Sequence, residues 1–351
     1  MKKILSVILI ISVLLCIFST TAFAATTDAE KSLLKLQQLD ADGDGEYRTS
    51  DAKEFLKAAA GIIDSSQGEY DLDGDGDVSV SDAQKALRIV SGIESVLTQE
   101  ETLALFNEKI NSVKTVRPGF QKEATVVCPS IKITTTNAPV AEMNVSDLEF
   151  DKYVDKIVKL MNTFPYNLAL NDEMKAQLRD MQAQAKEAYK AQTTTKTINK
   201  ASNSHFSNFP VDNLGWSSKL TVNDIASISC KVSDGNIVYT LKMDTITYVG
   251  DEYPTGTAGF SKRQSLPYGK AFNIPAFDES DGSILNKITF KDGKITLAVD
   301  LATGDVLSTD YYYSYVVDIT GAPQEDSELI MKTKTTSNVS EKYIMNRVTV
   351  A

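Results

Sequence analysis

The sequence has very few of the residues on which most catalytic motifs depend. Histidine and tryptophan occur once each, as His205 and Trp216. A single histidine in a polar stretch is far more often a surface residue than a catalyst. No GxSxG nucleophile elbow, phosphate-binding loop or zinc-ligand spacing is present. The sequence therefore indicates no catalytic residue. A carboxylate pair for glycoside hydrolysis stays open, because such pairs have no fixed spacing, but one tryptophan offers few aromatic platforms for sugars.

Cysteine is also scarce. Cys16 lies in the N-terminal leader described below, which leaves Cys128 and Cys230 in the rest of the chain. One pair does not make a disulfide framework. An exported chain permits a disulfide between them, and two separate buried thiols fit the sequence equally well.

Positive charge is in deficit, and the formal net charge is −11. The deficit is concentrated in residues 28–97, where acidic residues outnumber Lys and Arg by more than two to one. Because the sequence contains no basic stripe to neutralise phosphates, nucleic acid is not an expected partner. The local acidity points instead to cation binding in one module.

The N-terminus has the pattern of a signal peptide, expected to span residues 1–24. Lys2 and Lys3 precede an apolar run over 4–18, and Ala-Phe-Ala at 22–24 forms a cleavage site. The run is too short for a good spanning helix, so we expect no integral membrane segment in the mature chain. Cys16 raises the alternative of a lipid anchor, against which Leu15 argues. The protein is therefore expected to be secreted and extracellular, free or attached to the cell surface through a scaffold.

Two copies of one short unit lie close together in the acidic part of the chain. Residues 40–62 read DADGDGEYRTSDAKEFLKAAAGI, and residues 71–93 read DLDGDGDVSVSDAQKALRIVSGI. In each copy a helical stretch follows an aspartate-rich loop, and Gly61 or Gly92 is expected to end it as a left-handed cap. The residues expected to form a small shared core are Ala59, Ile62, Leu87, Val90 and Ile93.

Both loops fit the ligand pattern of calcium, which takes about six to eight oxygen ligands. A twelve-residue loop supplies them from positions 1, 3, 5, 7, 9 and 12, with glycine at position 6 for a sharp turn. The expected ligands in the second loop are Asp71, Asp73, Asp75, Asp77, Ser79 and Asp82. Those in the first loop are Asp40, Asp42, Asp44, Glu46 and Asp51. The sequence therefore predicts two bound Ca²⁺ ions.

The two loops are not expected to bind equally tightly. Arg48 occupies position 9 of the first loop, and a guanidinium has no lone pair to give. We therefore expect the second loop to bind Ca²⁺ more tightly. A module this small buries little apolar area, so bound metal would contribute much of its folding free energy. The alternative, two acidic turns that bind no metal, gives no reason for closely spaced, mutually repelling aspartates in both copies.

The closing residue separates these loops from an ordinary EF-hand. Both end in aspartate, Asp51 and Asp82, where that motif carries glutamate. No clear helix precedes the second loop. Two loop-then-helix repeats in an exported chain resemble a dockerin, over residues 40–93, and residues 25–97 would form the module. The resemblance implies Ca²⁺-dependent folding, binding to a cohesin module of a scaffold protein, and membership of a cellulosome-like, polysaccharide-degrading assembly.

The resemblance also implies a set of partner contacts at the last loop positions and along the following helix. The matched residues are Thr49, Ser50, Lys57, Val80, Ser81 and Arg88. Thr49 and Ser50 resemble the hydroxyl pair of dockerins, and Val80 departs from it. The alternative is that these residues are only solvated helix starts.

Residues 98–351 are expected to form one α+β domain. A capping box at 98–101 opens a helix over 98–115, and further helices are expected at 147–163 and 172–190. The polar stretch 191–211 is expected to be a loop. From residue 219 the alternation predicts an antiparallel meander, with hairpin turns at 233–236 and 292–293. The last strands are expected at 329–337 and 341–350.

The strand 310–319 shows the clearest alternation in this region. Tyr311, Tyr313 and Tyr315 share one face with Val317 and Ile319, and polar residues occupy the other. This pattern indicates a sheet with one covered face. The tyrosines are expected in the core rather than in a sugar-binding cleft. The complete prediction is an α+β protein: a small all-α module of paired EF-hand-like loop–helix motifs, then a helix-plus-antiparallel-meander domain.

The second domain carries resemblances but no motif. The runs FNEKINSVKTVRPGF, IASISCKVSDGNIVYTLKM and ITFKDGKITLAVDLATGDVLSTDYYYSYVVDIT look similar to uncharacterised secreted domains of gut Firmicutes. One amphipathic helix with a long meander also resembles the curved half-barrel carriers of the LolA/LppX kind, which implies an apolar concave face able to accept a lipid. Fold alone does not fix function.

Three functional hypotheses follow. The protein is a non-catalytic dockerin-bearing protein that docks on a cohesin, a dockerin-borne enzyme acting on polysaccharide, or a Ca²⁺-binding exported carrier of an apolar ligand without a cohesin partner. Cohesin capture in Ca²⁺ and in chelator separates the third from the others. A polysaccharide screen separates the first from the second.

Overall fold

The computed structural model describes residues 28–63, 69–135, 138–144, 152, 171–189, 191–203, 209, 218–256, 259–277, 279, 282–321 and 331–346. The expected leader, the expected helix at 147–163, His205 and Trp216 lie outside these residues, apart from position 152 of that helix. The described part combines helices with an antiparallel sheet, as predicted for an α+β protein.

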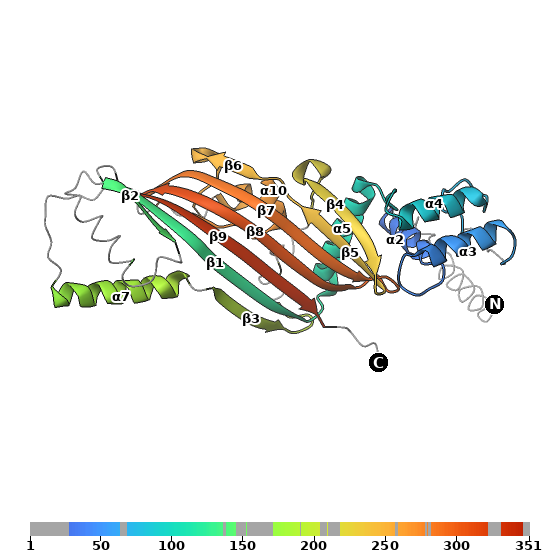
Figure 1. Cartoon of the computed structure of the whole chain (residues 1–351), viewed down its shortest axis with the longest axis horizontal. Coiled ribbons are helices and arrows are strands. Elements are labelled where there is room, and N and C mark those ends of the chain that lie inside the picture. Colours follow the sequence, from blue (N-terminus) through green and yellow to red (C-terminus); the bar gives the residue numbers. More distant parts are fainter. Residues whose placement is uncertain are drawn as a thin grey trace, which may run out of the picture.

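A single nine-stranded antiparallel sheet dominates the described part of the chain (Figure 1). Its order is β2-β1-β9-β8-β7-β5-β4, with β3 paired to β1 and β6 paired to β7. The strands are β1 (Phe120–Thr135), β2 (Ala138–Asn144), β3 (Gln192–Ile198), β4 (Ser227–Ser233), β5 (Asn236–Lys242), β6 (Ile246–Val249), β7 (Ile284–Asp300), β8 (Val306–Thr320) and β9 (Met331–Met345).

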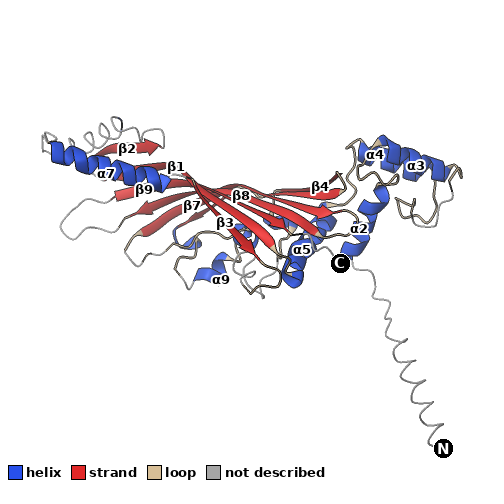
Figure 2. Cartoon of the chain, turned by 90° about the horizontal axis from the view of Figure 1, so that it is seen from below, coloured by secondary structure: helices blue, strands red, loops and turns tan. Residues whose placement is uncertain are grey.

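Helices lie at both ends of the sheet and across one of its faces (Figures 1 and 2). They are α2 (Asp28–Leu39), α3 (Thr49–Ala59), α4 (Val80–Val90), α5 (Gln99–Val116), α7 (Asp172–Tyr189), α9 (Phe260–Arg263) and α10 (Pro267–Ala271), with short 3-10 turns η2 (Val222–Asp224) and η3 (Gly250–Glu252). The helices α2, α3 and α4 form the repeat module at one end, and α5 crosses one face of the sheet.

The alternation of β8 places its aromatic residues in the core, as predicted. Tyr311, Tyr313 and Val317 are buried, whereas Tyr312 on the other face is 38% exposed. Around them Tyr268 stacks on Phe290, with ring centroids 5.0 Å apart. This aromatic layer fills the space between the sheet and α10, so the described part of the covered face is a packed core.

Helix α5 is built as its sequence indicates. The Thr98 hydroxyl accepts a hydrogen bond from the Glu101 amide at 3.1 Å, and the Glu101 carboxylate accepts one from the Thr98 amide at 2.9 Å. This capping box satisfies two N-terminal donors. The predicted apolar face, with Phe106 and Ile110, is buried against the sheet. The helix ends at Arg117, which adopts a left-handed conformation (φ +48°).

The prediction of a hairpin turn at 292–293 is wrong. Strand β7 runs through this point, and the register against β8 shifts between Lys291 and Lys294, which marks a β-bulge. Asp292 is left-handed (φ +57°). The Gly293 carbonyl accepts a hydrogen bond from the Met243 amide at 2.8 Å, which holds the bulge within the sheet. An Asp-Gly pair serves a bulge as well as a turn, because aspartate tolerates the positive φ that Asp292 adopts here.

Two further segment predictions need correction. Part of the loop expected at 191–211 is strand β3, which pairs with β1 along its whole length. Its threonines are β-branched and suit an extended edge strand. The two last strands are one, because β9 pairs continuously with β8 across residues 338–340. The hairpin at 233–236 is confirmed, with Asp234 and Gly235 both at positive φ.

Of the residues predicted to form the shared core of α3 and α4, Val90 packs against the observed core, but three others are exposed. Ile62 and Ile93 are 73% and 68% exposed, and Leu87 is also exposed. The shared core consists of Leu39, Ala52, Phe55, Leu72, Ala83, Ala86 and Ile89. Alanines at matched positions let the helix backbones approach closely. Each helix carries two apolar stripes, and the sequence pattern alone does not say which one is buried.

The two cysteines among the described residues do not form a disulfide. Cys128 on β1 and Cys230 on β4 are both free thiols, on strands far apart in the sheet order. Burial raises the pKa of both thiols, to about 11 for Cys230. No described helix is both long enough and apolar enough to cross a membrane.

Candidate calcium-binding loops and docking face

The two aspartate-rich loops have the same backbone conformation. In the first, Gly43 and Gly45 have φ of +73° and +81°, and in the second, Gly74 and Gly76 have φ of +79° and +93°. These angles favour glycine. The repeat in the sequence is therefore a repeat in structure, including the sharp turn at position 6 of each loop.

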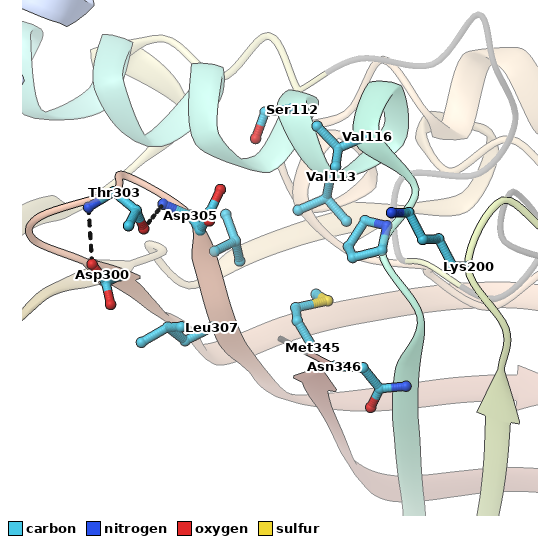
Figure 3. A pocket seen from close by; sticks show the side chains of 12 residues that line it. Ser112, Val113, Val116, Lys200, Asp300, Thr303, Asp305, Leu307, Met345 and Asn346 are labelled. Carbon is cyan, nitrogen blue, oxygen red and sulfur yellow. Dashed lines mark hydrogen bonds between the residues drawn. The ribbon is translucent and has the colours of Figure 1, made fainter. Parts of the chain in front are cut away.

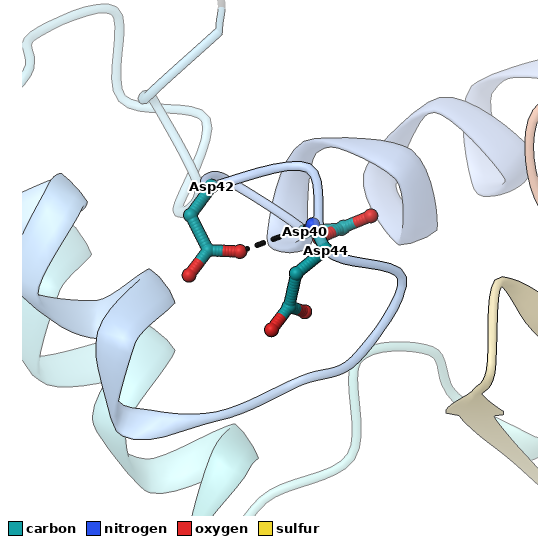
Figure 4. A group of neighbouring side chains, drawn as sticks. All are labelled: Asp40, Asp42 and Asp44. Carbon is teal, nitrogen blue, oxygen red and sulfur yellow. Dashed lines mark hydrogen bonds between the residues drawn. The ribbon is translucent and has the colours of Figure 1, made fainter.

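Three carboxylates gather in the first loop (Figure 4). Asp40, Asp42 and Asp44 each offer an oxygen, and these oxygens lie within 4.8 Å of one another. Asp44 also forms an ion pair with Arg48, whose Nη1 lies 2.7 Å from Oδ2. Arg48 therefore competes with a cation for one of the three ligands, in addition to leaving position 9 without an oxygen.

The second loop also gathers three carboxylates, but a different set. Oxygens of Asp71, Asp73 and Asp82 lie within 4.8 Å of one another. Asp82 is fully buried, and its Oδ1 accepts hydrogen bonds from the amides of Leu72 (2.7 Å) and Asp73 (3.1 Å). Its Oδ2 accepts one from Ser79 (2.8 Å). The closing aspartate thus joins the start of the loop to the start of α4.

The remaining expected ligands lie in the loops without joining either group of three. Asp51 is buried and accepts hydrogen bonds from the amides of Arg48 (2.7 Å) and Asp42 (3.3 Å), as Asp82 does in its copy. Asp75 accepts one from the Asp77 amide at 2.9 Å. Two other expected ligands have structural roles of their own. Ser79 caps α4, and Glu46 contacts the domain predicted at residues 98–351, called the sheet domain from here on.

The electrostatics of the first loop favour a cation. Burial raises the pKa of Asp40, and the nearby carboxylates raise it further. Burial likewise raises the pKa of Asp51, with Asp42 adding to the effect. Both causes penalise the charged form. A divalent cation removes this penalty, because it supplies the opposite charge at the same place.

The first loop also contacts the sheet domain. Glu46 Oε1 accepts hydrogen bonds from the Asp234 amide (2.6 Å) and the Ser233 hydroxyl (3.0 Å), and both bonds lower the pKa of Glu46. The Gly45 carbonyl accepts one from the Gly235 amide at 2.9 Å. A Cβ at Gly45 would lie 2.7 Å from the Gly235 nitrogen. The β4–β5 turn therefore sits directly on the candidate site.

Further contacts join the module to the sheet domain. Gln37 Nε2 donates to the Leu301 carbonyl at 2.8 Å, and Lys35 forms an ion pair with Glu101 at 2.8 Å. Tyr47 packs against both hydrophobic cores and donates its hydroxyl to the Leu36 carbonyl. The second loop has no such contact within the described residues.

The expected partner-binding residues lie on α3 and α4 and at their starts. Thr49, Val80 and Ser81 are exposed, and Ser50 is half-buried. On the following turns Lys57 pairs with Glu54 (2.5 Å), and the exposed Arg88 pairs with Glu94 (3.0 Å). The six residues occupy equivalent positions in the two copies.

Sequence reasoning missed an apolar component of this face. Leu56 and Leu87 are 50% and 47% exposed, next to Lys57 and Arg88 in the chain. They occupy matched positions, as do the exposed Ile62 and Ile93. The capped ends match too, because the amides of Ile62 and Ile93 donate to Lys57 and Arg88 carbonyls. The signal that could have found these residues is the repeat itself, which preserves large apolar residues outside the buried stripe.

A separate cavity of about 410 Å³ lies between the end of α5 and the sheet (Figure 3). Its apolar wall consists of Val113, Val116, Pro118, Val306, Leu307 and Met345. Lys200, Asp300 and Asp305 are among the polar residues at its edge. The Oδ1 atom of Asp300 already accepts hydrogen bonds from the amides of Ala302 and Thr303. An apolar wall with a few polar groups at its edge is the kind of lining that suits an apolar ligand.

Comparison with known proteins adds no assignment. No protein-family model matches the chain, and no curated protein sequence matches it. The chemistry of the site therefore has to be inferred from the chain's own residues, foremost from the two loops.

Proposed function

We propose that this protein is a secreted calcium-binding docking protein. Its repeat module would bind two Ca²⁺ ions and present α3 and α4 to a cohesin-type module of a scaffold protein. The observation that carries the proposal is the duplication of structure: two loops with the same glycine conformations, each gathering three carboxylates and each followed by a capped helix.

The chemistry of the exposed helix faces supports the docking role. Each copy offers a serine at the helix start, one exposed leucine and one basic residue: Ser50, Leu56 and Lys57, or Ser81, Leu87 and Arg88. Protein interfaces combine an apolar centre with a charged and polar rim in this way. A scaffold partner with an apolar patch flanked by carboxylates would fit either copy.

The test is capture by cohesins in buffered Ca²⁺ and in excess chelator. We expect capture only with Ca²⁺, and a loss of at least about tenfold in Leu56→Ala/Leu87→Ala, because each residue would lose a buried contact. The control is Leu34→Ala, since Leu34 is equally exposed but lies on α2. Cohesins differ in specificity, so a panel is used. Calcium-independent capture, or none across the panel, would contradict the proposal.

Under this proposal the protein would attach to a polysaccharide-degrading, cellulosome-like assembly. Its sheet domain would have no catalytic activity. A screen of plant polysaccharides for newly released reducing ends tests the second part. Release above that of heat-denatured protein would favour the alternative, a dockerin-borne polysaccharide-active enzyme.

A second candidate function is favoured by the cavity at the end of α5. Its apolar wall would suit an acyl chain, as in a carrier of an apolar ligand without a cohesin partner. The test is extraction of the purified protein followed by mass spectrometry, together with displacement of a fluorescent fatty acid. Val113→Trp would fill the cavity and should abolish the displacement signal. A signal unchanged by this substitution would place the fatty acid elsewhere.

A further inference from the structure

The face of the sheet opposite the aromatic core carries many lysines. In Figure 1 no described helix crosses this face over β5, β7, β8 and β9. We call it the lysine face. On β5, β7 and β9 it is defined by Lys242, Lys287, Lys294, Lys332, Lys334 and Lys342. These residues come from distant parts of the sequence, and only the strand pairing brings them together.

The strand registers place these lysines in polar rows that run across the sheet. Directly paired residues on neighbouring strands share a face. One row, from β5 to β3, consists of Lys242, Lys294, Tyr312, Ser340, Thr125 and Thr193. Another, from β7 to β1, consists of Lys287, Asp318, Lys334 and Lys132.

Each of these rows contains a pair of lysines in direct opposition. Lys242 of β5 is paired with Lys294 of β7, and Lys132 of β1 is paired with Lys334 of β9. Like charges in such positions destabilise a sheet. The opposition of Lys242 and Lys294 therefore favours an anionic partner at this part of the face.

Carboxylates on this face are too few to balance the lysines. Asp310 of β8 and Glu123 of β1 lie opposite Lys342, and Lys294 is a diagonal neighbour of Asp310 that also attracts its carboxylate. Asp318 accepts a hydrogen bond from Asn286 at 3.1 Å. Yet the whole chain has a formal charge of −11. Most of the net negative charge lies in the repeat module, whereas these lysines are gathered on one face of the sheet.

The surface between the lysines is rich in side chains with hydroxyl and amide groups. The hydroxyls of Thr247 and Thr289 lie 2.9 Å apart at the surface, Ser340 is exposed, and the buried Ser314 hydroxyl holds the half-buried Asn338 side chain at 2.7 Å. Tyr312 presents a partly exposed ring in the row that contains Lys294. These groups exchange hydrogen bonds with sugar hydroxyls readily, and a lysine ammonium pairs with a sugar carboxylate.

We propose that the lysine face binds an acidic polysaccharide of the polyuronate type. The observations favour it over two other anionic partners. Exposed apolar residues on this face, such as Ile284 and Ile344, stand singly at its edges and do not form a patch for bilayer insertion. Arginine, the preferred bidentate ligand of phosphates, is absent from the described outward positions of these strands.

The proposal does not depend on calcium-dependent docking, because the lysine face and helices α3 and α4 are different surfaces. Either can fail without the other. A protein docked through its repeat module would still present the lysine face at the opposite, sheet-bearing part of the molecule (Figure 1).

The test uses the mature full-length protein, loaded with Ca²⁺ and then freed of excess Ca²⁺ so that the polymer cannot be bridged by the metal. Binding to immobilised polygalacturonate is compared with binding to its fully methyl-esterified form. We expect at least about tenfold tighter binding to the acid form, weakening as salt rises. Lys242→Gln/Lys294→Gln should lower the affinity at least about tenfold, and Lys242→Arg/Lys294→Arg should retain it.

The matched control is Lys219→Gln/Lys262→Gln, which removes the same charge from exposed positions outside the lysine face and should leave binding unchanged. Circular dichroism checks that all variants are folded. Equal binding to both polymers, no binding, or equal losses in the two double variants would overturn the proposal. Tighter lysine-dependent binding to phosphatidylglycerol vesicles or to DNA would overturn the choice of partner.

Discussion

At the scale of single residues, Arg48 distinguishes the two candidate calcium loops. It takes the place that Ser79 holds in the second copy, and it forms an ion pair with Asp44 at 2.7 Å. This difference is visible in the sequence because the repeat supplies its own reference. What the sequence does not show is that the guanidinium folds back onto Asp44, an expected ligand of its own loop.

We predict that Arg48→Ser tightens Ca²⁺ binding in the first loop by about three- to tenfold, roughly 1 kcal/mol. The substitution releases Asp44 and restores an oxygen at position 9. Competition against a chromophoric chelator measures the change. Arg48→Lys keeps the charge and should give no gain, and Ser79→Arg should weaken the second loop. A gain from Arg48→Lys equal to that from Arg48→Ser would contradict the ligand assignment.

A second residue-scale prediction concerns Asp224. Although burial opposes its charge, hydrogen bonds from Lys270 (2.7 Å) and Thr221 hold its pKa below the usual value. A lowered pKa stabilises the fold above the unfolded pKa, and this contribution is lost as the pH falls through the folded pKa. We predict that Asp224→Asn lowers the free energy of unfolding by about 1–3 kcal/mol at pH 7. In urea titrations the difference should shrink below about pH 4; a difference independent of pH would contradict this.

At the scale of elements, the strands show how far local pattern reaches. The alternation of β8 correctly assigned its buried face, and the capping box correctly placed the start of α5. Asp292 with Gly293 satisfied the turn pattern, yet the neighbouring strands made it a bulge. The same holds for helices α3 and α4, where tertiary packing buried the stripe with Phe55 and Ile89 and left Leu56 and Leu87 exposed. Local chemistry permits both outcomes, and pairing with distant segments decides.

The opposed lysines give an element-scale prediction. Lys242→Gln should raise the free energy of unfolding by about 0.2–1 kcal/mol at low salt, because it removes repulsion from Lys294. Thermal unfolding at low and high ionic strength measures it, and the gain should fade as salt screens the charges. Lys231→Gln is the matched control, since Lys231 lies opposite Val238. A gain from Lys231→Gln of the same size would contradict the pairwise explanation.

At the scale of the whole molecule, the first aspartate-rich loop joins the two parts of the chain. The sequence located the loops and their expected ligands, because three alternate aspartates twice over are a strong local signal. It could not reveal that Glu46 accepts hydrogen bonds from Ser233 and Asp234, since those residues lie far along the chain. Nor could it reveal the lysine face, which strand pairing alone creates. Long-range contact is what the sequence leaves open.

This contact predicts that equivalent glycines will respond differently. Gly45→Ala places a Cβ against the β4–β5 turn, whereas a Cβ at Gly76 meets nothing within 4 Å. Both positions have positive φ, so both variants suffer backbone strain. We predict that Gly45→Ala lowers the free energy of unfolding by about 1–3 kcal/mol more than Gly76→Ala. Equal losses in chemical denaturation would show that the contact contributes nothing to stability.

The central claim is that the two loops bind calcium, and titration calorimetry of the chelator-treated protein with Ca²⁺ tests it most directly. We predict two bound ions per chain, with the weaker site lost in Asp40→Asn/Asp42→Asn and the tighter site lost in Asp71→Asn/Asp73→Asn. The melting temperature should rise with Ca²⁺ in the unaltered protein. No heat of binding and no shift in melting temperature at millimolar Ca²⁺ would contradict the claim.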